Sequence, residues 1–254
     1  MIIKRDIFFT PKNENRKLHI YLPNDYYNTD ERYPVMYFFD GHNMFNDEDA
    51  TYGKSWGMRE FLDSWWKKII IVGIECGHNG NERLSEYCPY SVNSGFAGYI
   101  EGIGDSTLNW MVNELKPVID RDYRTYPHRE ATGIGGSSMG GLMALYGGIK
   151  YNTTFSKAAC VSSAIGMCHY NLKRDLRETY INHDSTFFLS WGTEEAQKMP
   201  NPYYSQTAKH NLFFMHEFHR RGANAEVYCQ MGGHHCEADW EKQIPIFMDY
   251  FWKY

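Results

Sequence analysis

The sequence lacks any long hydrophobic run. No apolar stretch approaches the roughly 20 residues that a helix needs to cross a bilayer, and the first residues, MIIKRDIFFTPKNENRK, have no apolar core of the kind found in signal peptides. These two absences predict a cytoplasmic protein that has no membrane partner.

Runs of basic residues are also missing. The formal net charge is -5, so the chain lacks the positive surface with which proteins neutralise phosphates. We therefore expect no nucleic-acid partner. Hydrophobic residues make up 43% of the chain, which is ordinary for a globular protein with a core.

The sequence lacks the motifs that are typical of disulfide frameworks, metal sites and nucleotide-binding loops. The six cysteines include no C-x-x-C pair, so we expect reduced thiols. The run GIGGSSMGG lacks the lysine of a phosphate-binding loop, no G-x-G-x-x-G opens the first helix, and His216 and His219 form H-E-F-H rather than H-E-x-x-H. We accordingly predict no cofactor and no metal site.

Apolar strand patterns alternate with helical patterns along the chain. This alternation predicts β-α-β units and a mostly parallel sheet of about eight strands flanked by helices. No repeat or linker is visible, so we expect one domain over residues 1–254. The connection over residues 76–103 has no clear period, helices are expected over residues 107–119, 203–221 and 237–251, and the strands are expected at residues 2–10, 17–22, 33–39, 69–74, 131–136, 155–162, 186–191 and 225–230.

One tight turn between a strand and a helix carries the pattern Gly136-Ser137-Ser138-Met139-Gly140. Only Ser138 fits G-x-S-x-G. Glycines are needed there because side chains flanking a raised nucleophile would collide with the strand or the helix. The helix that follows directs its free N–H groups at the serine, where an oxyanion would form. Ser138 is the candidate nucleophile.

Two further strand ends carry the groups that activate a serine. Glu195 follows the strand at 186–191 and His235 follows the strand at 225–230, which gives the chain order Ser, acid, His. A histidine takes the proton of the serine, and a carboxylate orients that histidine. Glu194 and His234 are adjacent alternatives that the strand-end argument alone leaves open. The N–H groups of Met139 and His42 are the expected oxyanion donors.

The motifs together resemble the putative-esterase (esterase D-like) family of α/β-hydrolases. That family includes feruloyl and acetylxylan carbohydrate esterases, enterochelin-type esterases, S-formylglutathione hydrolase and mycolyltransferases. The matching segments are YPVMYFFDGHNMF, ERLSEYCPY, GGSSMGG, SWGTEE and GGHHCEADW.

The resemblance implies the α/β-hydrolase fold and selects among the alternatives. A histidine followed five positions later by Trp240 is His235, and an acid three positions after the strand-end glycine is Glu195. The residue after the Asp-Gly pair is His42, whose N–H the resemblance makes the second oxyanion donor.

These features predict a serine esterase for short-chain or aromatic esters, of acetyl or feruloyl type and carried by a saccharide. Trp56, Arg83, Tyr87 and Trp191 are the expected substrate-binding residues. A siderophore-lactone or thioester hydrolase is the second hypothesis, and a non-catalytic binding module with a hydrolase fold is the third. The short segment 164–184 predicts little or no lid. The sequence predicts no particular oligomeric state.

Overall fold

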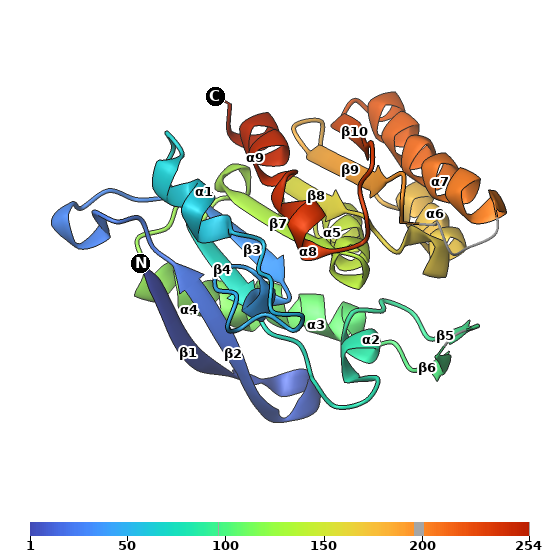
Figure 1. The fold of residues 1–254 in the computed structure, drawn as a ribbon. Helices are drawn as coiled ribbons and strands as arrows, with labels where there is room; N and C mark the ends of the chain where they lie inside the picture. Colours follow the sequence, from blue (N-terminus) through green and yellow to red (C-terminus); the bar gives the residue numbers. More distant parts are fainter. Residues whose placement is uncertain (96, 196–200, 254) are drawn as a thin grey trace.

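An eight-stranded sheet forms the centre of the protein. The computed structural model describes residues 1–95, 97–195 and 201–253. The strand order is β1-β2-β4-β3-β7-β8-β9-β10 (Figure 1). The first hairpin and the β2–β4 pair are antiparallel, and all other pairs are parallel, which confirms the expected mostly parallel sheet. The strands are Ile2–Phe9 (β1), Glu14–Tyr21 (β2), Val35–Phe39 (β3), Ile70–Ile74 (β4), Thr132–Ser137 (β7), Lys157–Val161 (β8), Thr186–Gly192 (β9) and Asn224–Gln230 (β10).

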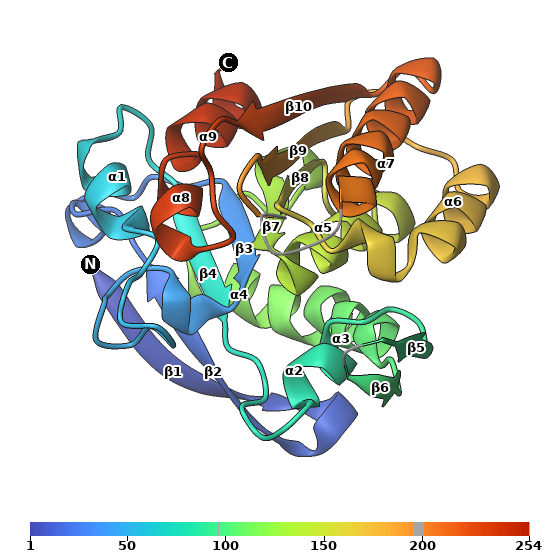
Figure 2. The same ribbon diagram turned by 45° about the vertical axis from the view of Figure 1, so that its right-hand side comes forward.

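Helices cover both faces of this sheet (Figures 1 and 2). One face carries α3 to α7, and the opposite face carries α1, α8 and α9. The helices are Met58–Ser64 (α1), Glu82–Glu86 (α2), Gly104–Trp110 (α3), Lys116–Asp122 (α4), Met139–Lys150 (α5), His169–Glu178 (α6), Asn201–Arg220 (α7), Glu237–Glu241 (α8) and Ile244–Trp252 (α9). No helix in the described part of the chain combines the length and apolarity needed to span a bilayer.

Strand β3 shows why the central strands read as unbroken apolar runs. Val35, Tyr37 and Phe39 pack in the core beneath α3 to α7, whereas Met36 and Phe38 pack in the core beneath α1 and α9. Successive side chains of a strand point to opposite faces, so a strand covered on both sides needs apolar residues at every position. That one domain extends over residues 1–254 stays a prediction.

Two expected helices are interrupted, and a proline accounts for each interruption. The helix predicted over residues 107–119 has a π-helical turn, Met111–Leu115, before Pro117, and the helix predicted over residues 237–251 is divided into α8 and α9 before Pro245. Proline has no N–H to donate to the preceding turn and is favoured in the first turn of a helix. Each proline therefore begins a new helical segment.

The connection over residues 76–103 has structure that its sequence pattern did not predict. It contains α2 and a small hairpin of Val92–Ser94 (β5) and Gly98–Ile100 (β6). Its anchor to the sheet is an ion pair in which Arg16 of β2 contacts Glu86 of α2 at 2.7 Å, and both side chains are at most 4% exposed. Glu86 also accepts a hydrogen bond from the Gly77 N–H at 2.9 Å.

We expect Arg16→Met to lower the free energy of unfolding by about 3–5 kcal/mol, because it leaves the Glu86 carboxylate buried without its cation. Urea unfolding followed by circular dichroism measures this change. The matched control is Arg220→Met, which breaks the exposed pair with Glu217 and should cost less than about 1 kcal/mol. Equal losses in the two variants would contradict a structural role for the Arg16–Glu86 pair.

Candidate active site

Ser138 occupies the tight turn between β7 and α5. Its backbone has φ 56° and ψ -117°, a conformation that residues with a side chain rarely adopt. A Cβ atom on Gly136 would lie 2.7 Å from the carbonyl carbon of Gly140, and one on Gly140 would lie 2.9 Å from Cβ of Phe39. Neither glycine of the G-x-S-x-G pattern therefore has room for a Cβ atom, and Ser138 lies at the edge of the sheet, directly after β7.

Glu195 contacts both a histidine and the strand that precedes it. Its Oε2 lies 3.3 Å from Nδ1 of His235. Its Oε1 accepts hydrogen bonds from the Gly192 N–H at 2.7 Å and from the Ser162 hydroxyl at 2.6 Å. These contacts hold the carboxylate in one orientation, so that its second oxygen faces the histidine ring.

Ser162 and Trp240 support this pair, and we did not predict a role for Ser162. The Trp240 indole N–H donates to the Ser162 hydroxyl at 3.0 Å, and that hydroxyl donates in turn to Glu195. The His235 ring also packs edge-on against the Trp240 ring at a centroid distance of 5.0 Å. The position of Ser162 could have indicated this role, because the residue directly follows β8 at the same edge of the sheet.

The neighbouring alternatives contact other groups. His234 has its Nδ1 3.3 Å from Oδ2 of Asp239, and its backbone N–H donates to the same oxygen at 2.7 Å. Glu194 accepts a hydrogen bond from the Thr193 hydroxyl at 3.3 Å. The geometry therefore brings Glu195 together with His235 and pairs His234 with a different acid.

The loop after β3 is fastened by an ion pair. Arg83 donates two hydrogen bonds to Asp40, at 2.7 and 2.8 Å. Burial by itself raises the pKa of the Asp40 carboxyl, but the Arg83 charge outweighs it and holds that pKa below its usual range. Asp40 has φ 57° and leads into the helical turn Gly41–Asn43, which contains His42. Like Met139 at the start of α5, His42 lies in a first helical turn, where N–H groups have no partner within the helix.

A cleft of about 560 Å³ lies at this part of the molecule. Ser138, His235, His42 and Arg83 all border it. Glu237 of α8 also lines the cleft, and burial raises the pKa of its carboxyl. The other lining residues are Asp40, Asn43, Thr51, Tyr52, Cys76, Gly77, His78, Gly80, Ser137, Cys236 and Trp240.

Three of the four expected substrate-binding residues lie elsewhere. Trp56, Tyr87 and Trp191 are buried side chains that do not line this cleft. Trp56 packs against Trp240 with a centroid distance of 5.7 Å, and the Tyr87 hydroxyl accepts a hydrogen bond from the Asp40 N–H at 3.0 Å. Aromatic residues near a site are often part of its packed support, which is their position here. Of the four, only Arg83 borders the cleft.

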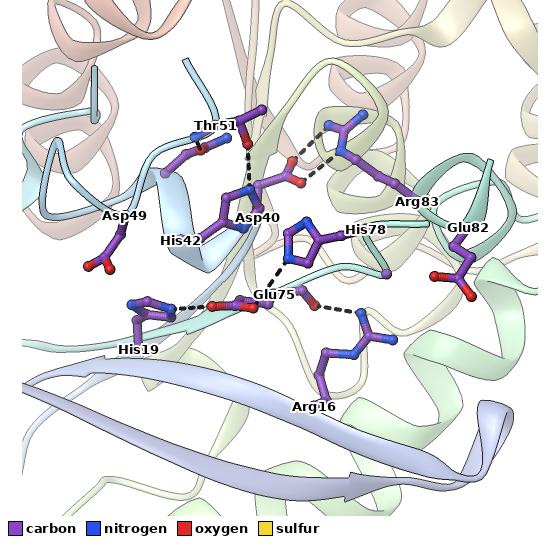
Figure 3. A network of polar contacts seen from close by, with 12 residues as sticks. Arg16, His19, Asp40, His42, Asp49, Thr51, Glu75, His78, Glu82 and Arg83 are labelled. Atoms are coloured by element: carbon purple, nitrogen blue, oxygen red, sulfur yellow. Dashed lines mark hydrogen bonds and ion pairs between the residues drawn. The ribbon is translucent and has the colours of Figure 1, made fainter. Parts of the chain in front are cut away.

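A group of potential metal ligands also lies in the cleft, although no metal site was expected from the sequence. His42, Cys76 and His78 each place a ligand atom within 4.8 Å of the others. Glu75 contacts His78 and the buried His19 (Figure 3), and although burial opposes it, these hydrogen bonds lower the pKa of Glu75 to about 2. The three residues come from two strand ends and so form no local motif.

Comparison with known proteins places the chain in a family. A family model described as "Putative esterase" matches residues 11–249. The uncharacterized protein YbbA of Bacillus subtilis is 25% identical over 191 residues, which are 74% of this chain and 72% of that protein. The esterase Rv1288 of Mycobacterium tuberculosis is 31% identical over 148 residues, which are 57% of this chain but only 28% of that protein.

Solved structures share the fold. An IroE-like serine hydrolase from Shewanella oneidensis has a TM-score of 0.78 at 20% identity, over 100% of this chain and 80% of that one. A ferulic acid esterase has a TM-score of 0.70 at 16% identity, over 100% and 97%. The enterobactin esterase FES of Shigella flexneri has a TM-score of 0.73 at 16% identity, over 100% and 59%. These likenesses show the α/β-hydrolase fold.

We expect Gly136→Ala to lower the free energy of unfolding by about 1–3 kcal/mol, because its new methyl group meets rigid helix backbone. Gly133→Ala on the same strand is the control, because its nearest contact is the flexible Met36 side chain, at 3.1 Å, and Cβ of Lys157 lies at an ordinary contact distance of 3.5 Å. Thermal unfolding of both variants measures the difference. If Gly133→Ala is as damaging as Gly136→Ala, the close approach of α5 is not the reason for the glycine.

Proposed function

The chain belongs to the Putative esterase family and is a carboxylic ester hydrolase, and from this premise we propose that it cleaves esters by a serine mechanism. Ser138 is the nucleophile, His235 the general base and acid, and Glu195 the orienting carboxylate. The observation that carries the assignment is the contact at 3.3 Å between Glu195, which follows β9, and His235, which follows the adjacent β10. Ser138 follows β7, two strands away from β9, and lines the same cleft as His235. Groups at the carboxyl edge of a parallel sheet act together in this way.

In the first step the Ser138 hydroxyl oxygen attacks the ester carbonyl carbon while Nε2 of His235 takes the hydroxyl proton. The negative charge on the carbonyl oxygen is stabilised by the N–H groups of Met139 and His42. Glu195 accepts the Nδ1–H of His235 and stabilises the imidazolium. The C–O bond to the alcohol then breaks, the alcohol leaves with the proton from His235, and an acyl-Ser138 remains.

In the second step a water molecule gives its proton to His235 and attacks the acyl carbon. The bond between that carbon and the Ser138 oxygen breaks, and the serine recovers its proton from His235. The carboxylic acid product is released. Ser162 and Trp240 act as positioning residues, because they touch Glu195 and its support rather than the reacting atoms.

The substrates that we propose are short-chain or aromatic esters, of acetyl or feruloyl type, carried by a saccharide. The structural likeness to a ferulic acid esterase supports this class. The cleft is polar along the Asp40 and Arg83 side, and the exposed ring of Tyr52 at its border offers a face for a sugar or an aromatic acyl group. The likeness to an enterobactin esterase supports the second hypothesis, a siderophore lactone, with a thioester as a related possibility.

We expect Ser138→Ala to reduce hydrolysis of p-nitrophenyl acetate, p-nitrophenyl butyrate and methyl ferulate by at least about 10³-fold while the protein stays folded. Steady-state kinetics beside circular dichroism measures both properties. Relative rates on the three esters rank the acyl groups. A folded Ser138→Ala variant that keeps wild-type rates would refute the serine mechanism.

Variants at two pairs of adjacent residues test which histidine and which glutamate act with Ser138. We expect His235→Ala and Glu195→Gln to lower kcat strongly, because each removes a group that activates Ser138. His234→Ala and Glu194→Gln should retain kcat within about 3-fold, because these side chains contact other partners. Loss of kcat in His234→Ala with retention in His235→Ala would reverse the assignment of the histidine.

A further inference from the structure

Two histidines and a cysteine converge at the wall of the cleft. His42 comes from the loop after β3, and Cys76 and His78 come from the segment after β4. One ring nitrogen from each histidine and the Cys76 sulfur lie within 4.8 Å of one another. The two imidazole rings are 4.9 Å apart at an interplanar angle of 75°, so they meet edge to face rather than stacked. Figure 3 shows the rings of His42 and His78 close together near Glu75.

In each histidine ring, Nε2 already has a polar partner. Nε2 of His42 lies 3.0 Å from the Thr51 hydroxyl, and Nε2 of His78 lies 3.3 Å from Oε2 of Glu75 (Figure 3). Metal-binding histidines usually donate their second ring N–H to an oxygen of this kind, which fixes the tautomer and frees the other nitrogen as a ligand. In both histidines, Nδ1 is therefore the nitrogen that is available to bind a metal.

Nδ1 of His42 has a further property that points to a ligand. This atom is fully buried and has no hydrogen-bond partner. The residue as a whole is only 6% exposed. A buried polar atom without a hydrogen-bond partner destabilises the folded state. A metal ion bonded to Nδ1 would satisfy it.

We propose that His42, Cys76 and His78 form a binding site for a divalent transition metal of the zinc class. Two imidazole nitrogens and one thiolate are a ligand set that suits Zn²⁺, and three protein ligands leave one position of a tetrahedron open. All three residues also line the cleft that holds Ser138 and His235. The open position therefore faces the cleft, where water or a substrate oxygen completes the coordination.

Binding requires one proton transfer and a small movement. The Cys76 thiol gives its proton to solvent as the metal–sulfur bond forms. Ligand atoms on a tetrahedral zinc are roughly 3.3–3.6 Å apart, which is closer than the present group. His78 is the residue able to move inward, since its side chain is 56% exposed whereas those of His42 and Cys76 are buried.

Titration of the purified protein with Co²⁺ and Zn²⁺ tests the site without any ester. We expect one equivalent of Co²⁺ to bind with the near-ultraviolet charge-transfer absorption of a cobalt–thiolate bond and the visible spectrum of a tetrahedral ion, and Zn²⁺ to displace it. Cys76→Ser should remove the charge-transfer absorption, and His78→Ala should weaken Co²⁺ affinity at least 10-fold. The exposed position of His78 makes this second variant safe for folding.

Matched controls are Cys229→Ser and His216→Ala, which remove a cysteine and an exposed histidine outside the group. Both should bind Co²⁺ as the wild type does. Absence of the thiolate absorption in the wild type, or its persistence in Cys76→Ser, overturns the proposal. Repeating the titration in Ser138→Ala separates the two proposals, because metal binding should be unchanged there whatever the variant does to hydrolysis.

Discussion

The close approach of α5 to β7 is the constraint on which the rest of the site depends. A Cβ atom on Gly136 would collide with the Gly140 backbone, and one on Gly140 would collide with Cβ of Phe39. Ser138 lies between these two glycines, has an unusual backbone conformation and directly precedes α5. Strain of this kind, of order 1–3 kcal/mol, persists only where surrounding packing determines it. The buried sheet beneath provides that packing and holds Ser138 in the same cleft as His235.

Position at strand ends was enough to predict which strands carry the candidate site residues. The pattern around Ser138, and acids and histidines placed directly after later strands, depend only on local sequence and on the parallel order of the sheet. The local pattern and the parallel order could both be predicted from the sequence, because the central strands are apolar at every position. The choice of Glu195 over Glu194 needed more than a strand end, since adjacent residues differ in direction, and the resemblance to a family supplied it.

Long-range contacts were the part that sequence patterns did not reveal. The chain of hydrogen bonds from Trp240 through Ser162 to Glu195 joins helix α8 to the ends of two strands, and no spacing rule relates them. Aromatic residues near the site looked like a binding surface, but Trp56 is packed in the core instead. The group His42, Cys76 and His78 was invisible for the same reason, because the two loops that carry it become neighbours only when β3 pairs with β4.

The pairing of β3 with β7 has a consequence for folding kinetics. It joins residues 35–38 to residues 132–135, and the earlier strand brings the His42 loop to the Ser138 turn. Contacts between such distant parts of a chain close large loops and form slowly relative to local helices. Because the proposed oxyanion donors come from both sides of this junction, recovery of activity during refolding should follow the formation of helical structure. Enzymatic turnover thus reports on the joining of the two halves of the sheet, which helix content alone would miss.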